Sequence, residues 1–176
     1  LNAGDDNAPP VPYTRGVDVR IEAIGAPLWQ LIDFREQVDA SRRAGLEAAL
    51  EASGLLDAWV TPDGVRLATE DNATRLDSQW VSRPATTGAS LADWLCAAVA
   101  ADSPVSPQAL DALLAAVACG YADPDAAEAW VSPDGRFRLG ALAGAWTKRE
   151  ATYIGHAARA AARRRRLEEI GRRLDE

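Results

Sequence analysis

The residue types that most often perform catalysis are few in this chain and are not grouped. The single histidine, His156, lies among alanine and arginine residues, with no nucleophile or carboxylate at an informative spacing from it. The two cysteines, Cys96 and Cys119, lie in alanine-rich helical patterns, which predicts buried, reduced thiols and neither a metal pair nor a disulfide framework. The sequence also lacks a Gly-x-x-x-x-Gly-Lys-Ser/Thr phosphate loop. We therefore expect no catalytic residues, no cofactor and no metal ion in this chain.

The densest charge in the chain is a run of four arginines, Arg163, Arg164, Arg165 and Arg166. Residues 148–176 hold nine Lys/Arg against five Asp/Glu, a charge of +4, whereas residues 1–147 hold ten against 21, a charge of −11. An acidic body does not attract nucleic acid by its overall field. The arginine run is therefore the candidate for DNA contact, although four consecutive helical residues point in different directions and do not form one face.

A short phrase occurs twice, 71 residues apart, and predicts architecture more than chemistry. In both copies Ala-Trp-Val and one Thr or Ser precede Pro-Asp-Gly. Proline sets φ at the first corner of a type I turn, aspartate bonds back to the backbone, and glycine accepts the left-handed conformation that follows. We predict a β-hairpin in each copy, pairing residues 58–60 with 65–67 and residues 129–131 with 136–138. The residues that define the repeat are Trp59, Pro62, Asp63, Gly64, Trp130, Pro133, Asp134 and Gly135.

Helical patterns precede both copies. Asp39 or Ser41 can cap a helix over residues 41–53 that Gly54 closes. Ser106 can cap a second helix that starts at Pro107 and ends near residue 120, and Ser90 can cap another over residues 90–101. Residues 17–22 alternate as a half-buried strand does, and residues 28–34 favour a strand over a short buried helix.

These patterns predict an α+β fold. Two related helix-plus-β-hairpin units, residues 28–68 and 91–142, share one compact domain over residues 17–147. The polar, proline-bearing residues 1–16 predict a flexible tail or linker. Residues 148–176 predict a helix that starts a coiled coil, because a seam of positions recurs at alternating spacings of three and four and becomes Leu and Ile toward its end. The seam positions are Tyr153, His156, Ala160, Arg163, Leu167, Ile170 and Leu174. No stretch approaches the roughly 18 apolar residues of a membrane span, so we expect no membrane partner.

A helix followed by a hairpin is also typical of a winged-helix DNA-binding module, and this alternative remains open. Charge argues against it. The helix predicted over residues 41–53 has Arg42 and Arg43 at its start but Glu47 and Glu51 after them, and residues 107–119 contain no basic residue. Phosphate contacts supply most of the affinity for DNA, and such helices would make few of them.

Three stretches of the chain carry a family resemblance. They are residues 26–35 (APLWQLIDFR), residues 43–60 (RAGLEAALEASGLLDAWV), and residues 135–140 (GRFRLG) together with Tyr153-Ile154-Gly155 and the arginine run. They resemble the central region of the condensin-like ATPases, akin to the structural-maintenance-of-chromosomes (SMC) proteins, of the bacterial anti-plasmid systems called Wadjet. In such proteins ATPase halves at the two chain ends are joined by long antiparallel coiled coils, and a central domain turns the chain around. The resemblance covers about residues 17–176.

The resemblance implies a hinge domain of a cytoplasmic, SMC-like protein. Such a domain forms a homodimer, and its other partner is the coiled-coil arm of its own chain. ATP and Mg²⁺ would bind to head domains of the parent protein, so this stretch would bind no cofactor. DNA cleavage would belong to a partner subunit. The chain departs from the family pattern at residues 1–16, where a hinge would receive an incoming helix.

Overall fold

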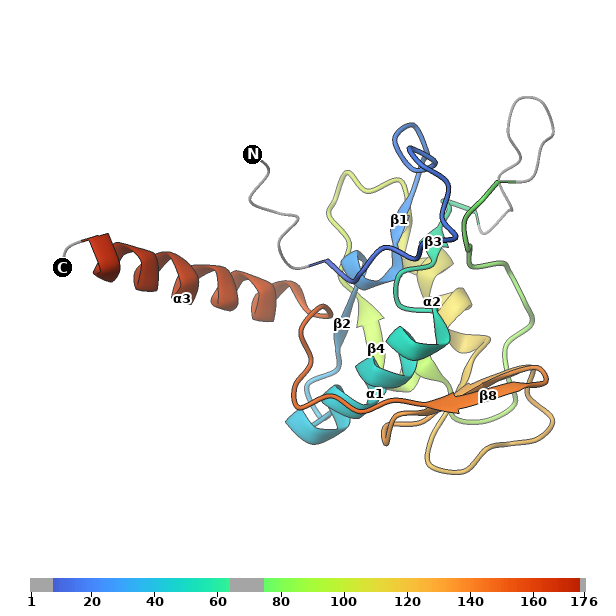
Figure 1. Ribbon diagram of the computed structural model, residues 1–176. Coiled ribbons are helices and arrows are strands. Elements are labelled where there is room, and N and C mark those ends of the chain that lie inside the picture. Colours follow the sequence, from blue (N-terminus) through green and yellow to red (C-terminus); the bar gives the residue numbers. More distant parts are fainter. Residues whose placement is uncertain (1–7, 64–74, 175–176) are drawn as a thin grey trace.

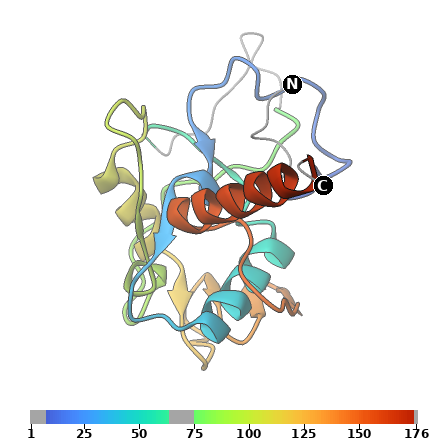
Figure 2. The same ribbon diagram turned by 90° about the vertical axis from the view of Figure 1, so that its left-hand side faces the viewer.

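Short strands and three helices make up the part of the chain that the computed structural model describes, residues 8–63 and 75–174 (Figures 1 and 2). The fold is α+β, as expected. The helices are α1 (Ala40–Ser53), α2 (Pro107–Ala115) and α3 (His156–Leu174), with 3₁₀ turns η2 (Leu28–Gln30) and η3 (Leu91–Asp93). The strands are β1 (Ala26–Pro27), β2 (Ile32–Phe34), β3 (Trp59–Val60), β4 (Leu95–Ala97), β5 (Ala118–Cys119), β6 (Ala129–Val131), β7 (Arg136–Leu139) and β8 (Leu142–Ala145).

The strands form three small sheets around one apolar core. Strands β1 and β3 pair antiparallel, as do β2 and β4, and the largest sheet has the order β5-β6-β7-β8. Helix α1 packs across β6, β7 and β8, and α2 packs against η3 and β4. Burying one large aliphatic side chain stabilises the fold by about 1.5–3 kcal/mol. The largest fully buried aliphatic side chains are Leu28, Ile32, Leu46, Leu50, Leu56, Val60, Leu91, Leu95, Leu110, Leu114 and Ile154.

The chain passes twice through the same succession of a 3₁₀ turn, a strand, a helix and a short strand. The first pass is η2-β2-α1-β3 and the second is η3-β4-α2-β5. The two passes meet where β2 pairs with β4, and their flanking bonds are reciprocal. Arg35 N–H donates to Trp94 O at 2.9 Å, and Ala98 N–H donates to Leu31 O at 2.7 Å. Residues 35 and 98, like residues 31 and 94, differ by 63 positions, so this succession has a different period from the 71-residue repeat of Trp-Val.

The predicted caps are confirmed, and the second hairpin forms with residues 129–131 paired to 137–139, one residue beyond the predicted 136–138. The Asp39 carboxylate accepts from Arg42 N–H at the start of α1, Gly54 ends the helix with φ +84°, and Ser106 caps α2. Strands β6 and β7 pair antiparallel through Trp130↔Arg138 and Val131↔Phe137. Helix α2 ends at Ala115, earlier than predicted, because Ala118 and Cys119 pair with β6 as strand β5. The two cysteines consequently lie in strands rather than helices, and both are free thiols.

Two predicted elements are wrong. Residues 17–22 form consecutive turns, with Asp18 at φ +59°, and the side chains of Val17 and Ile21 are 92% and 74% exposed rather than half-buried. Ser90 does cap a helical turn, but η3 ends after three residues and the chain continues as β4 instead of a helix to residue 101. Pairing with β2 outweighs the helical propensity of this alanine-rich stretch. Residues 28–34, predicted as a strand, divide into η2 and β2.

The first copy of the repeated phrase has other strand neighbours than the second. Trp59 pairs with Pro27 on one side and bridges to Gln79 on the other, whereas Trp130 lies between β5 and β7. Pro62 and Asp63 form a turn, but Gly64 and the predicted partner strand, residues 65–67, lie outside the described residues. The described part of the predicted tail, residues 8–16, contacts the domain through Arg15, which pairs with Asp57 and Asp77.

Helix α3 extends away from the rest of the molecule as a single rod (Figure 1). It begins at His156, whereas the sequence predicts the helical segment over residues 148–176. Residues 146–155, which we call the strap, are not helical and connect β8 to α3. None of the described helices is both long enough and apolar enough to cross a membrane.

Candidate functional site at the root of the exit helix

A fully buried carboxylate on α1 fastens the strap to the domain. Glu47 is 0% exposed, and its two oxygens accept hydrogen bonds from Thr152 N–H at 2.7 Å, Tyr153 N–H at 3.1 Å and Ile154 N–H at 2.9 Å. Three consecutive backbone donors converge on one carboxylate, which is a strong arrangement for holding a charge away from water. We call Glu47, Glu51, Lys148 and residues 152–154 the junction.

Lys148 completes the junction. Its ammonium donates to Glu47 Oε1 at 2.7 Å, Glu51 Oε2 at 2.8 Å and Thr152 Oγ1 at 2.9 Å, so each of its three protons has an acceptor. The same ammonium lies 4.3 Å from the centre of the Tyr153 ring. Lys148 is the single lysine in a chain that otherwise uses arginine. A compact ammonium with three rotatable donors suits this convergence of acceptors, and a planar guanidinium does not.

The second Pro-Asp-Gly turn packs against α1 at Gly45, two residues before Glu47. A Cβ on Gly45 of α1 would lie 1.8 Å from Pro133 O, so only glycine lets the turn approach the helix this closely. Gly135 has φ +93°, and its carbonyl accepts from Trp146 N–H at 3.0 Å. The hydrogen bond from Arg136 lowers the pKa of Asp134 to about 2. The turn thus joins α1, the β6–β7 hairpin and the start of the strap.

The arrangement suits anchoring better than proton chemistry. A carboxylate with every strong acceptor direction occupied, at 0% exposure, has no lone pair left for a substrate. Among the described residues no group of three or more His, Cys, Asp or Glu side chains is placed to hold a metal ion. Burial, with a smaller contribution from the charge of Asp93, raises the pKa of the Cys119 thiol and keeps it protonated.

Helix α3 presents an unpaired apolar seam. Leu167, Ile170 and Leu174 follow the predicted spacing and are 60%, 49% and 81% exposed. Arg163, Arg164 and Arg166 are exposed on the same helix, whereas the side chains of Arg165 and of residues 156–162 lie outside those that the structure describes. The upper part of the predicted seam, including His156 and Ala160, is therefore untested.

None of the repeat or arginine-run residues predicted from the sequence belongs to the junction, but the second Pro-Asp-Gly turn packs against α1 beside it. That turn is Pro133, Asp134 and Gly135. Trp59, Pro62 and Asp63 follow α1 in the chain, and Trp59 Nε1–H donates to Ile24 O at 3.2 Å. Sequence reasoning missed Glu47, Lys148 and Gly45. Two signals were present: one lysine in an arginine-rich chain, and a glutamate between two residues of the apolar face of a helix.

Comparison with known proteins gives no match: no family model, no curated protein and no solved structure is similar to this chain.

Alkaline titration tests the junction. Burial disfavours the charged ammonium, but the hydrogen bonds and charges of Glu47 and Glu51 outweigh it and raise the pKa of Lys148 above 10.5. A raised folded-state pKa contributes stability that is complete below pH 10.5 and is lost as the pH rises through the folded-state value. We expect the titration midpoint of the single lysine Nζ signal in NMR spectra to lie above that of an ordinary lysine side chain, and to fall in a Glu51→Gln variant, which lacks one of the two carboxylates. An unraised pKa in the unmodified protein would show that the ammonium does not bind these acceptors in solution.

Proposed function

We propose that this chain is a hinge-like dimerisation domain of an SMC-like ATPase of the Wadjet class, a cytoplasmic scaffold in defence against plasmid DNA that catalyses no reaction of its own. The observation that carries the proposal is the anchored exit helix. A rod that leaves a domain with an apolar seam exposed needs a partner helix, and a saturated carboxylate fixes the segment from which the rod emerges. Such an arrangement transmits the direction of an arm to the domain, as the hinge of a coiled-coil protein must.

The repeated succession of elements supports the finer part of the proposal. Two passes of 3₁₀ turn, strand, helix and strand, joined through β2 and β4, are the kind of paired units expected of a domain that turns a chain around. The units that support it are not the helix-plus-hairpin units of residues 28–68 and 91–142. The supporting units are the passes η2-β2-α1-β3 and η3-β4-α2-β5, whose bonded residues correspond at an offset of 63 positions.

Strand β8 provides the surface that we assign to the dimer. Trp146 N–H continues the β7–β8 ladder by donating to Gly135 O, and bonded and non-bonded positions alternate along an antiparallel pair. Ala143 and Ala145 therefore direct their N–H and C=O groups to the open edge. Among the strands of the described chain only β7 pairs with β8.

The occupant of this edge is a second copy of the chain. Exposed edge strands are normally protected by charge or proline, yet residues 140–147 contain neither, and Leu142 and Trp146 are 62% and 55% exposed. A net charge of −7 opposes self-association, so two copies should meet where charge is absent. Antiparallel pairing of β8 with its own copy uses the same residues on both sides, as a two-fold dimer requires.

A charge placed on the open edge tests the surface. We expect Ala143→Lys to weaken dimerisation by about tenfold or more, measured as the monomer–dimer constant in sedimentation velocity. The matched control Ala85→Lys places the same charge on an exposed loop and should leave the constant unchanged. Ile170→Lys, in the seam of α3, should also leave it unchanged. Dimerisation that Ile170→Lys abolishes and Ala143→Lys spares would move the interface to the arm.

The alternative function is a DNA-binding module, and the exposed Arg163, Arg164 and Arg166 favour it. The arginines of α1 do not: Arg42 pairs with Asp39, and Arg43 donates to Val38 O at 2.7 Å. Salt-sensitive binding of duplex by a strictly monomeric chain, lost when the three α3 arginines are neutralised, would favour this alternative over the hinge.

A further inference from the structure

Residues 11–24, which we call the cover, lie against the domain with the usual polarity of a folded segment reversed. Five of the apolar side chains of the cover are between 62% and 99% exposed: Val11, Tyr13, Val17, Ile21 and Ile24. None of its apolar side chains belongs to the core or packs against it. The side chains that the cover turns toward the domain are those of Arg15 and Arg20, which are 11% and 16% exposed. Polar contacts therefore hold the cover, without the apolar burial that stabilises the rest of the domain.

Arg20 of the cover fills a site that suits a guanidinium group. Its Nε and Nη2 donate to the two carboxylate oxygens of Asp77 at 2.7 Å and 2.9 Å, and its Nη2 also donates to Asp57 O at 2.7 Å. The guanidinium carbon lies over the Trp59 ring, 5.0 Å from the ring centre. A two-pronged contact with a carboxylate and an aromatic face favour arginine over lysine. We call Asp57, Asp77 and Trp59 the acceptor site.

The domain itself holds the acceptor site in place. Trp29 Nε1–H donates to the Asp57 carboxylate at 3.1 Å, and Ser78 N–H donates to that of Asp77 at 2.8 Å. Trp59 N–H donates to Ser78 O at 2.9 Å, so β3 and residues 77–78 bring the three groups of the site together. The arrangement of the acceptors thus comes from the domain, whereas the cation comes from the cover.

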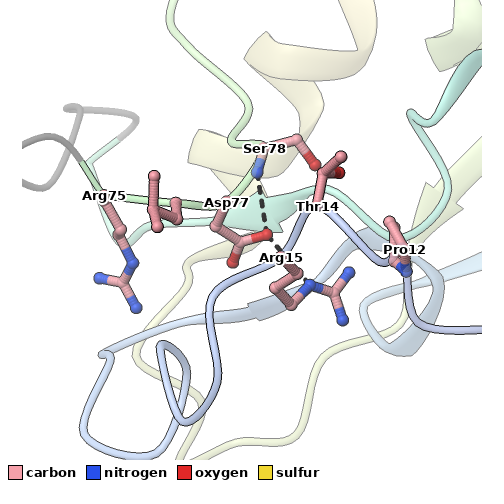
Figure 3. Close-up of a pocket in the computed structure, with 7 residues that line it drawn as sticks. Pro12, Thr14, Arg15, Arg75, Asp77 and Ser78 are labelled. Atoms are coloured by element: carbon pink, nitrogen blue, oxygen red, sulfur yellow. Dashed lines mark hydrogen bonds and ion pairs between the residues drawn. The ribbon is translucent and has the colours of Figure 1, made fainter.

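The cover is packed loosely over the acceptor site. A cavity of about 330 Å³ lies between residues 12, 14 and 15 of the cover and residues 75–78 of the domain. Figure 3 shows Arg15 and Asp77 in contact at the wall of this cavity. Segments that bury few apolar groups open locally at a lower free energy than the whole fold. Opening of the cover would therefore empty the acceptor site while the core stays folded.

We propose that the acceptor site binds an arginine side chain of a partner protein, and that Arg20 of the cover occupies it in cis until the partner displaces the cover. Burial by itself would raise the pKa of Asp77, but the hydrogen bond and charge of Arg20 lower it, so the carboxylate is ionised. A buried charge without a counter-charge is costly, so the opened site favours a replacement cation. The pair of carboxylate oxygens and the Trp59 ring select guanidinium over ammonium. The site would stand whether or not the domain is a hinge.

The test empties the site with Arg20→Ala in the whole chain and uses N-acetyl-arginine amide as the probe. Binding is followed through the Trp59 indole Nε1–H resonance in ¹H–¹⁵N NMR spectra, assigned by its absence from a Trp59→Phe variant. We expect the probe to bind Arg20→Ala at least about tenfold more tightly than the unmodified chain, in which Arg20 competes. N-acetyl-lysine amide should bind Arg20→Ala about tenfold more weakly than the arginine probe. The matched control Arg83→Ala, at an exposed arginine paired with Glu128, should bind the probe as the unmodified chain does.

Amide hydrogen exchange in the unmodified chain tests the opening of the cover separately. The Gly16 amide donates to Leu76 O at 2.7 Å, across the contact between the cover and the domain. We expect this amide to exchange faster than the amides of α1, because the cover opens without the core. If the Gly16 amide exchanged only with the free energy of global unfolding, the cover would not open on a folded domain and the inference would be overturned.

Three binding results would also overturn it. The first is a Trp59 resonance of Arg20→Ala that stays in place throughout the titration, which excludes a guanidinium site. The second is equal binding of the lysine and arginine probes, which is unselective attraction of a cation to an acidic chain. The third is equal binding of the arginine probe to Arg20→Ala and to the unmodified chain, which shows that Arg20 does not compete. If circular dichroism shows that Arg20→Ala is unfolded, Arg20→Lys takes its place with the same expected order of affinities, because it keeps the charge and removes the fork.

Discussion

Replacing Glu47 with alanine is expected to lower the free energy of unfolding by about 3–5 kcal/mol, because removing one partner of a buried ion pair leaves uncompensated groups inside the protein. The three backbone N–H groups of Thr152, Tyr153 and Ile154 would lose their acceptor, and Lys148 would keep only Glu51 and Thr152. Glu47→Gln should be nearly as harmful despite its matching shape. Both carboxylate oxygens accept from N–H groups, so the amide nitrogen would face donors with a donor.

The measurement is urea unfolding of the whole chain together with amide hydrogen exchange at residues 152–154. Glu51→Ala is the matched control, since it lies one turn further along α1, is 25% exposed and removes only one acceptor of Lys148. It should cost about 1 kcal/mol. An unchanged unfolding midpoint for Glu47→Ala, with the three amides still protected, would show that the strap is held by other contacts.

Replacing Gly45 with alanine is expected to destabilise the fold by about 2–3 kcal/mol, although alanine is the better helix former by about 1 kcal/mol. The added Cβ would lie 1.8 Å from Pro133 O, so α1 or the β6–β7 turn must move. The sign of the change in unfolding free energy is therefore diagnostic. At a helical position where a Cβ has room, replacing glycine with alanine stabilises the protein, whereas at residue 45 it should destabilise it.

Gly171 of α3 supplies that comparison, since nothing lies within 4 Å of the place that a Cβ would take on this residue. Gly171→Ala should leave the unfolding midpoint of the domain unchanged and raise the helical signal in circular dichroism. If Gly45→Ala left the unfolding midpoint unchanged or raised it, the turn and the helix would not be in contact in solution.

Local signals in the sequence predicted the local structure well. Asp39 and Ser106 cap α1 and α2 with their side chains, and Gly54 ends α1 in the left-handed conformation. Pro133-Asp134-Gly135 forms the turn between β6 and β7. Where non-local pairing decides, the prediction failed. Residues 95–97 have helical composition, but the open edge of β2 makes them a strand. No property of either stretch alone contains that information.

The 71-residue repeat of Trp-Val and the repeated succession of elements have different periods. The repeat in the sequence is recognised by identical side chains around Trp59 and Trp130. The two passes of the chain instead correspond through backbone hydrogen bonds, from Arg35 N–H to Trp94 O and from Ala98 N–H to Leu31 O, which residues of almost any type can form. Identity between side chains therefore did not reveal this second correspondence. The junction was hidden for the same reason, since Glu47 and Lys148 are 101 residues apart and become a pair only after folding.

Sedimentation equilibrium of the unmodified chain over a wide range of concentrations tests the proposed function most directly. A hinge-like dimerisation domain predicts a mass that rises with concentration toward twice the 18.7 kDa of one chain. A mass that stays at 18.7 kDa at the highest concentration would contradict the proposal that this domain joins two copies.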